Sequence, residues 1–284
     1  MAGHGGEAFW LDSARCGWET SPYYAPEVPE WVARSNRERY NLSYIAPEWR
    51  TLYEKGRYLN TRNWDIVLTG KSRKDKDEPG EGRLKLTSDY DKMLYTPAGN
   101  TAVLGFAKQA IAQFKLGDDA TPDLLNICLD TPRRISEAYG PESVEVEDMY
   151  YRLDRDLADF LTFVFAQVRN GEVLVVFTSD HGTIRVDNPV KVTGDRETSA
   201  NLRYKTGRNL AYNSRDVYEI LKPEDVQLPS SNLTSSYIFA YNSDFLVYNN
   251  DANRHIRYYR NTFQHGGISM EEMIVPYIVL KPKQ

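Results

Sequence analysis

An Asp-His-Gly tripeptide at residues 180–182 follows closely on a run of β-forming residues, 173–177. Asp180 and His181 can present an oxygen and a nitrogen to a metal ion, and ligands of open α/β sheets bind at the carboxyl ends of the strands. Gly182 permits a tight turn beside the pair. The same dipeptide also fits a turn in which Asp180 caps the backbone and His181 is an ordinary polar residue. For an isolated dipeptide this second interpretation is favoured.

A second histidine precedes the last apolar run of the chain. His265 is followed by Gly266 and Gly267, and then by Ser269 and Glu271, which favour a short helical turn. Paired glycines let the backbone approach a ligand held by His265, although such a pair is also common in simple turns. The chain has only four histidines, and two of them, His181 and His265, lie in candidate metal-binding segments.

Basic residues are concentrated between these two segments. Arginine grips phosphate oxygens in pairs, so the group is a candidate substrate clamp, with a solvated surface loop as the alternative. The candidate phosphate-binding residues are Arg185, Arg196, Arg203, Lys205 and Arg208.

The elements that must position these residues alternate between helix and strand. Apolar residues recur at helical spacing over residues 103–114 and 143–168, and apolar runs at 124–129 and 173–177 predict buried strands. Further strands are expected at 237–240, 245–248 and 273–280. This order predicts an α/β fold with a mostly parallel central sheet.

The domain organisation follows from a change in composition near residue 100. Residues 1–99 are rich in Trp, Tyr and Pro and predict an irregular cap or insertion, with a short strand at 64–68 and a charged loop at 71–83. Residues 100–284 form the expected α/β core. We predict a single domain over residues 1–284.

Composition excludes several classes of protein. The net charge of −5 argues against a general nucleic-acid binder, and no apolar run approaches the ~20 residues of a membrane span. Cys16 and Cys128 cannot form a disulfide framework. No signal peptide is visible, so we expect a cytoplasmic protein, or a periplasmic one if the natural N-terminus lies further upstream.

The histidine segments and their surroundings resemble the alkaline phosphatase superfamily. Residues 180–284 resemble the PglZ domain of Bacteroidetes response regulators, through residues 180–186, 194–198, 201–205, 207–210 and 259–267. Residues 1–180 resemble a different branch, the phosphate-irrepressible alkaline phosphatases, through residues 2–4, 9–12, 29–31, 96–100 and 139–143.

This resemblance implies an alkaline phosphatase-like sandwich and a metal-dependent phosphoric ester hydrolase, acting on monoesters or diesters. Family enzymes hold two zinc ions with three Asp and three His. The implied ligands are Asp180, His181 and His265, with Asp130 as a further candidate. Asp130 can equally be a turn cap ahead of Pro132. The implied substrate is a phosphate ester, including nucleotides and oligonucleotides, and a response-regulator-type partner or fused domain is a further expectation.

Other parts of the family pattern have no match in this chain. Arg134 stands where the resemblance implies a histidine four residues after Asp130. The family's Thr or Ser nucleophile lies upstream of a segment that here occupies residues 2–4, so the first strand and helix units are expected to be missing. The alternatives are a degenerate regulatory or binding module of the same family, and a truncated or chimeric fragment.

Overall fold

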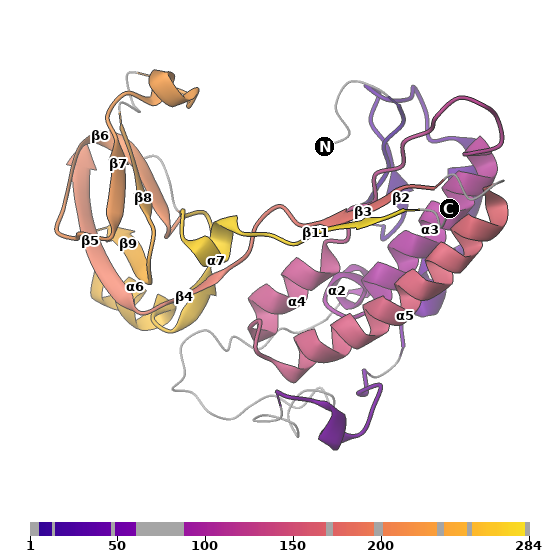
Figure 1. Cartoon of the computed structure of the whole chain (residues 1–284), viewed down its shortest axis with the longest axis horizontal. Coiled ribbons are helices and arrows are strands. Elements are labelled where there is room, and N and C mark those ends of the chain that lie inside the picture. Colours follow the sequence, from indigo (N-terminus) through magenta and orange to yellow (C-terminus); the bar gives the residue numbers. More distant parts are fainter. Residues whose placement is uncertain are drawn as a thin grey trace. The chain divides into compact units, whose positions relative to one another are not determined.

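The computed structural model describes residues 6–12, 15–46, 49–60, 88–168, 173–195, 201–231, 236–248 and 252–281 (Figure 1). Contacts group them into two compact units, one ending at Val173 and the other running from Leu174 to Lys281. The expected strand at 64–68, the expected loop at 71–83 and Arg196 lie outside the described residues.

The first unit is mainly helical. Its elements are β1 (Trp10–Leu11), β2 (Trp18–Glu19), α1 (Glu30–Glu38), η1 (Tyr40–Tyr44), η2 (Lys55–Arg57), α2 (Asp89–Leu94), α3 (Ala98–Phe114), α4 (Thr131–Tyr139) and α5 (Val144–Gln167). The two helices predicted from apolar spacing correspond to α3 and α5, which pack against each other. Ser143 begins α5 by accepting a hydrogen bond from the Val146 amide.

The core of this unit is formed by one face of each long helix. Leu104 and Ile111 of α3 and Met149 and Phe160 of α5 are buried in one cluster with Ile135 of α4. The strand predicted at 124–129 is not formed: this segment is irregular, and most of it is exposed. The apolar composition of this segment is typical of a buried strand, but no described strand pairs with it. A segment with β-propensity forms a strand only where a neighbouring strand packs beside it.

The second unit is built on a five-stranded sheet. Its strands are β5 (Asn188–Asp195), β6 (Tyr204–Tyr212), β7 (Val217–Ile220), β8 (Ser236–Ala240) and β9 (Asp244–Tyr248), in the order β7-β8-β6-β5-β9. Among the strands that the structure describes, only β5 and β9 are parallel. The expected mostly parallel sheet is therefore wrong for the described strands. Parallel neighbours need a long crossover connection, usually a helix. The β6–β7 connection is only residues 213–216, and residues 221–231 of the β7–β8 connection hold only the short 3₁₀-helix at Pro223–Val226.

Two further strand pairs and three helices complete the described part of this unit. They comprise β3 (Val175–Thr178), β4 (Ile184–Val186), η4 (Pro223–Val226), α6 (Ala252–Tyr259), β10 (Thr262–Gln264), α7 (Met270–Met273) and β11 (Tyr277–Leu280). The predicted central strand is β3, which pairs only with β11 among the described strands and forms an antiparallel two-stranded ribbon. All four residues of β11 are exposed.

Among the described residues, no helix has the length and apolar character needed to cross a bilayer.

Candidate metal centre

Two short strands bring the two histidine segments together. β4 begins three residues after His181, β10 ends one residue before His265, and the two strands pair antiparallel with Gln264 opposite Ile184. The imidazole rings of His181 and His265 consequently stack, with centroids 4.1 Å apart and planes inclined by 15°. Residues far apart in the sequence thus form one pair of adjacent nitrogen donors.

The tautomer of His181 is set by its own loop. Nδ1 lies 2.9 Å from the carbonyl oxygen of Gly182. Because a carbonyl oxygen only accepts, this contact requires the proton on Nδ1 and leaves the lone pair on Nε2. A hydrogen bond of this kind commonly orients histidines that bind metals.

Asp180 adds an oxygen donor beside that nitrogen. Its Oδ1 accepts a hydrogen bond of 3.0 Å from the His181 amide, and its Oδ2 lies 3.7 Å from His181 Nε2. Two ligand atoms of a tetrahedral zinc ion with bonds of about 2.1 Å lie roughly 3.4 Å apart. The Asp180 side chain is 84% exposed, so an ion and a substrate can reach it from solvent.

The three side chains do not yet converge on one point. Across the described ranges, no three His, Cys, Asp or Glu side chains are grouped closely enough to hold a metal ion. Lone pairs lie in the ring plane, and nearly parallel rings cannot aim them at a common ion, so a metal would require one ring to rotate. The donor set still suits zinc, which takes imidazole nitrogen and carboxylate oxygen.

The segment after His265 was only partly anticipated. Ser269 begins the expected helical turn, α7, and Glu272, which was not singled out, forms the capping box with it. The signal was the spacing Ser-x-x-Glu, which defines a capping box. Asn201 was also missed: its Nδ2 donates to the backbone oxygen of His265 over 3.3 Å.

Asp130 lies in the other unit, at the start of α4. Its Oδ1 accepts from Arg133 Nε over 2.8 Å, and its Oδ2 accepts from Arg134 Nε over 2.7 Å. Burial alone would raise the pKa of Asp130, but the two guanidinium groups outweigh it and lower the pKa. This carboxylate is thus neutralised by arginines; its role as a metal ligand stays a prediction.

Comparison with protein families identifies the chain. The description that matches residues 131–280 is "BREX system PglZ alkaline phosphatase-like domain". The chain belongs to this PglZ family. The match extends across residue 180, where the resemblance of the sequence changes from one branch of the superfamily to another.

Relatives of this PglZ-family chain carry related names. Alkaline phosphatase PafA of Elizabethkingia meningoseptica is 35% identical over 183 residues, which cover 62% of this chain and 33% of PafA. Alkaline phosphatase PhoV of Synechococcus elongatus is 32% identical over 181 residues, covering 63% and 33%. A protein of Myroides odoratus named calcium-transporting ATPase is 35% identical over 187 residues, covering 64% and 34%. The chain spans about a third of the length of these curated relatives.

A solved structure confirms the fold class. Wild-type alkaline phosphatase PafA superposes with a TM-score of 0.69 at 21% identity, covering 96% of this chain and 62% of that chain. The expected alkaline phosphatase-like α/β fold is therefore confirmed, although its described strands do not form a mostly parallel sheet.

The candidate phosphate-binding residues of this PglZ-family chain divide by burial. Arg185 and Arg208 are exposed, and the Arg185 guanidinium lies 4.8 Å from the centroid of the Phe263 ring. Arg203 and Lys205 are buried, and Lys205 Nζ lies 3.9 Å from the centroid of the Tyr248 ring. Their burial counts against a role in gripping substrate, since a buried charge cannot reach a phosphate in solvent.

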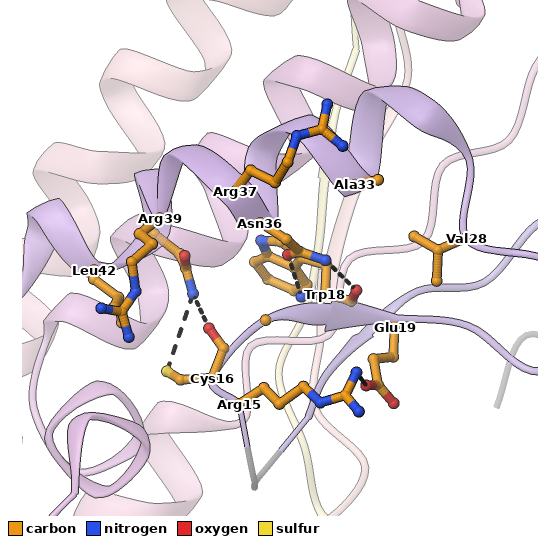
Figure 2. A pocket seen from close by; sticks show the side chains of 12 residues that line it. Arg15, Cys16, Trp18, Glu19, Val28, Ala33, Asn36, Arg37, Arg39 and Leu42 are labelled. Carbon is orange, nitrogen blue, oxygen red and sulfur yellow. Dashed lines mark hydrogen bonds and ion pairs between the residues drawn. The ribbon is translucent and has the colours of Figure 1, made fainter.

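A pocket in the first unit offers little chemistry of its own (Figure 2). The side-chain amide of Asn36 is hydrogen-bonded to the backbone of Trp18. Its Oδ1 accepts from the Trp18 backbone N–H over 2.7 Å, and its Nδ2 donates to the Trp18 carbonyl oxygen over 2.8 Å. Burial, with the charge of Asp89 as a smaller cause, raises the pKa of Cys16 to about 11. The Cys16 thiol thus stays protonated at neutral pH and is a poor nucleophile.

Proposed function

We propose that this chain binds zinc through Asp180, His181 and His265, as part of the metal centre of a phosphoric ester hydrolase. The observation that carries the proposal is the contact between the His181 and His265 rings, 4.1 Å apart. Membership of the PglZ family and the phosphatase names of two relatives support the same reaction class.

Each of the three residues has a distinct task. The Gly182 carbonyl oxygen holds Nδ1 of His181, which leaves the lone pair of Nε2 for a metal ion. The negative charge of Asp180 next to that nitrogen favours a divalent cation. His265 completes the set once its ring leaves the stack. Bound zinc would supply Lewis-acid polarisation of a phosphoryl oxygen.

The substrate class follows from the charges near the site. Arg185 belongs to β4, the strand that begins just after His181, and it is exposed. An arginine there favours an anionic phosphate ester, a monoester or a diester such as a nucleotide or oligonucleotide. Hydrolysis also needs a nucleophile, and the sequence pattern assigns none in this chain. Zinc binding is therefore the property that we expect of the chain itself.

The test measures zinc binding and phosphoester hydrolysis separately. We expect one or more zinc ions per chain by elemental analysis of the dialysed protein. We also expect a loss of affinity of about 10-fold or more in Asp180→Ala and His265→Ala. His255→Ala is the matched control, because His255 lies on α6 and has no assigned role. Absence of zinc, or equal affinity in all three variants, would overturn the proposal.

A degenerate binding module is the second candidate. It is favoured by the lack of three converged ligands in the described part of the chain. Zinc binding without turnover of aryl phosphate monoesters and diesters would support this module. Turnover that disappears in Asp180→Ala would support the hydrolase.

A further inference from the structure

We infer that Glu272, held by Arg203, is a positioning residue that locks the backbone of the His181 and His265 loops to each other, so that the two candidate zinc ligands stay side by side. The inference rests on the zinc site proposed above. Neither residue is given a catalytic role, since both are buried and neither reaches solvent.

The Glu272 carboxylate holds the loop that follows His265. Its Oε1 accepts from the Gly267 amide over 2.9 Å, and its Oε2 accepts from the Ser269 amide over 3.1 Å. The glycine is required at this point, because a Cβ on Gly267 would lie 2.4 Å from the Ala240 carbonyl oxygen. The loop can therefore approach the sheet closely enough to meet the carboxylate.

The backbone of the same residue holds the loop that follows His181. The Gly182 amide donates to the Glu272 carbonyl oxygen over 2.9 Å. A Cβ on Gly182 would lie 2.1 Å from the Glu271 carbonyl oxygen, which shows how closely the two segments approach. One residue thus bonds to the glycine next to His181 and to the second glycine after His265.

Arg203 holds Glu272 in place. Its Nε donates to Oε1 over 3.0 Å and its Nη2 donates to Oε2 over 2.8 Å, which is a bidentate pair. The same guanidinium donates to the carbonyl oxygens of Asp244 and Ala240, and so ties the pair to β9 and β8. Arg203 is 0% exposed and Glu272 is 1% exposed, so the pair cannot exchange partners with water.

The placement of this pair distinguishes positioning from simple stabilisation. A buried ion pair is weak evidence for stability, because an apolar pair of similar volume is often as stable. An apolar pair would, however, leave the Gly267 and Ser269 amides without their acceptor. What the charged pair adds is a fixed path for the backbone on both sides of the two histidines.

The experiment compares zinc dissociation constants of the whole chain by competition with a chromogenic chelator. We expect Glu272→Gln to weaken zinc binding by about 10- to 100-fold, the range typical of residues that orient metal ligands. Glu271→Gln is the matched control, since the neighbouring side chain is exposed, and it should bind zinc as the parent does. Hydrogen exchange of the Gly182 and Gly267 amides in the zinc-free protein should be faster in Glu272→Gln only.

Two more variants separate positioning from folding. Val192→Ala removes buried atoms from β5 and should lower stability without changing zinc affinity. The double variant Arg203→Met/Glu272→Met keeps an apolar core and should fold, yet bind zinc as weakly as Glu272→Gln. This double variant also gives the answer if Glu272→Gln fails to fold.

The outcomes are distinct from those of the proposed function. Parent-like zinc affinity in Glu272→Gln or in the double variant overturns the positioning role and leaves the zinc site standing. If the parent chain binds no zinc, the proposed function fails. The exchange rates of Gly182 and Gly267 then decide alone whether Glu272 locks the two loops: unchanged rates overturn the inference.

Discussion

Asp148 in the helical unit and Glu272 in the sheet unit are both buried carboxylates, each surrounded by donors. Asp148 is 0% exposed and accepts from Trp49 Nε1 over 2.6 Å, Tyr58 Oη over 2.5 Å and Arg152 Nε over 2.7 Å. Glu272 accepts from one guanidinium and two loop amides. The first carboxylate fastens an aromatic segment to a helix, whereas the second fastens the His265 loop to a residue whose backbone carbonyl holds the His181 loop.

The difference lies in what would move if each carboxylate were lost. Around Asp148 the released groups are the Trp49 and Tyr58 side chains, the Arg152 guanidinium and the Leu52 amide, none of which adjoins a candidate zinc ligand in the sequence. Around Glu272 the released groups are the Arg203 guanidinium and the Gly267 and Ser269 amides, which shape the backbone after His265 and hold in place the residue that bonds to Gly182. We therefore expect Asp148 to control stability and Glu272 to control metal affinity.

Replacement of Asp148 tests the first half of this comparison and carries the largest expected effect. Asp148→Asn keeps the shape but turns an amide NH₂ toward donors that need an acceptor, so we expect a loss of about 3 kcal/mol in the free energy of unfolding. Urea unfolding followed by circular dichroism measures it. Zinc affinity should be unchanged.

The control for this variant lies on the same helix. Asp159 contacts Lys108 Nζ over 2.5 Å, but its side chain is 77% exposed. Asp159→Asn should therefore cost well under about 1 kcal/mol. Equal losses in the two variants would contradict the role of burial, and a loss of zinc affinity in Asp148→Asn would remove the contrast between the two carboxylates.

Gly182 tests the second half of the comparison without altering a charge. A methyl group there would lie 2.1 Å from the Glu271 carbonyl oxygen, so the two loops must separate in Gly182→Ala. We expect the free energy of unfolding to fall by about 2 kcal/mol and zinc binding to weaken. Gly56→Ala is the control, because a Cβ on Gly56 meets nothing within 4 Å. Zinc affinity equal to that of the parent in Gly182→Ala would contradict the close approach of the loops.

The pH dependence of stability sharpens the description of the Asp148 cluster. Burial, together with the hydrogen bond donated to Asp148, raises the pKa of Tyr58 to about 12. Between the unfolded value of about 10 and that value, the unfolded chain releases the proton and the folded chain keeps it, so stability falls as the pH rises. Tyr58→Phe should lower the free energy of unfolding by about 1 kcal/mol at neutral pH.

The measurement compares parent and Tyr58→Phe by urea unfolding at about pH 9 and about pH 11. The advantage of the parent should shrink at the higher pH, because only the parent loses the contribution of Tyr58. A constant difference between the two proteins would show that Tyr58 ionises equally in the folded and unfolded chains.

The sequence predicted the helices better than the sheet. Apolar residues at helical spacing specify α5 locally, because its buried face repeats along one element. The strand prediction at 173–177 rested on β-propensity, which does not say which strand lies next to which. β5 was missed although Val190 and Val192 alternate with exposed Lys191 and Thr193, the pattern of a half-buried strand.

The candidate site was predictable in its residue types but not in its support. His181 and His265 were singled out by their glycine neighbours and by the family resemblance. Glu272 was not, because its partner Arg203 lies 69 positions away and nothing local pairs them. Arg203 was instead interpreted as a phosphate ligand, since a sequence does not show which of several arginines is buried.

Replacement of Asp130 carries the smallest expected effect. The burial of this carboxylate is intermediate between that of buried Asp148 and that of exposed Asp159. Its side chain is 37% exposed and paired with two arginines that are themselves partly exposed. We expect Asp130→Asn to cost less than about 1 kcal/mol, and less still in high salt, because water and ions screen such pairs. The lowered pKa of Asp130 means that this contribution is present above the unfolded value of about 3.9 and is lost as the pH falls through the folded value.

The same variant decides between the two interpretations of Asp130. If Asp130 is a metal ligand, Asp130→Asn should weaken zinc binding by about 10-fold or more, as loss of a ligand oxygen requires. If it only pairs with Arg133 and Arg134, zinc affinity should equal that of the parent while salt and pH change the small stability difference. We expect the second result, because both carboxylate oxygens already accept hydrogen bonds from guanidinium groups.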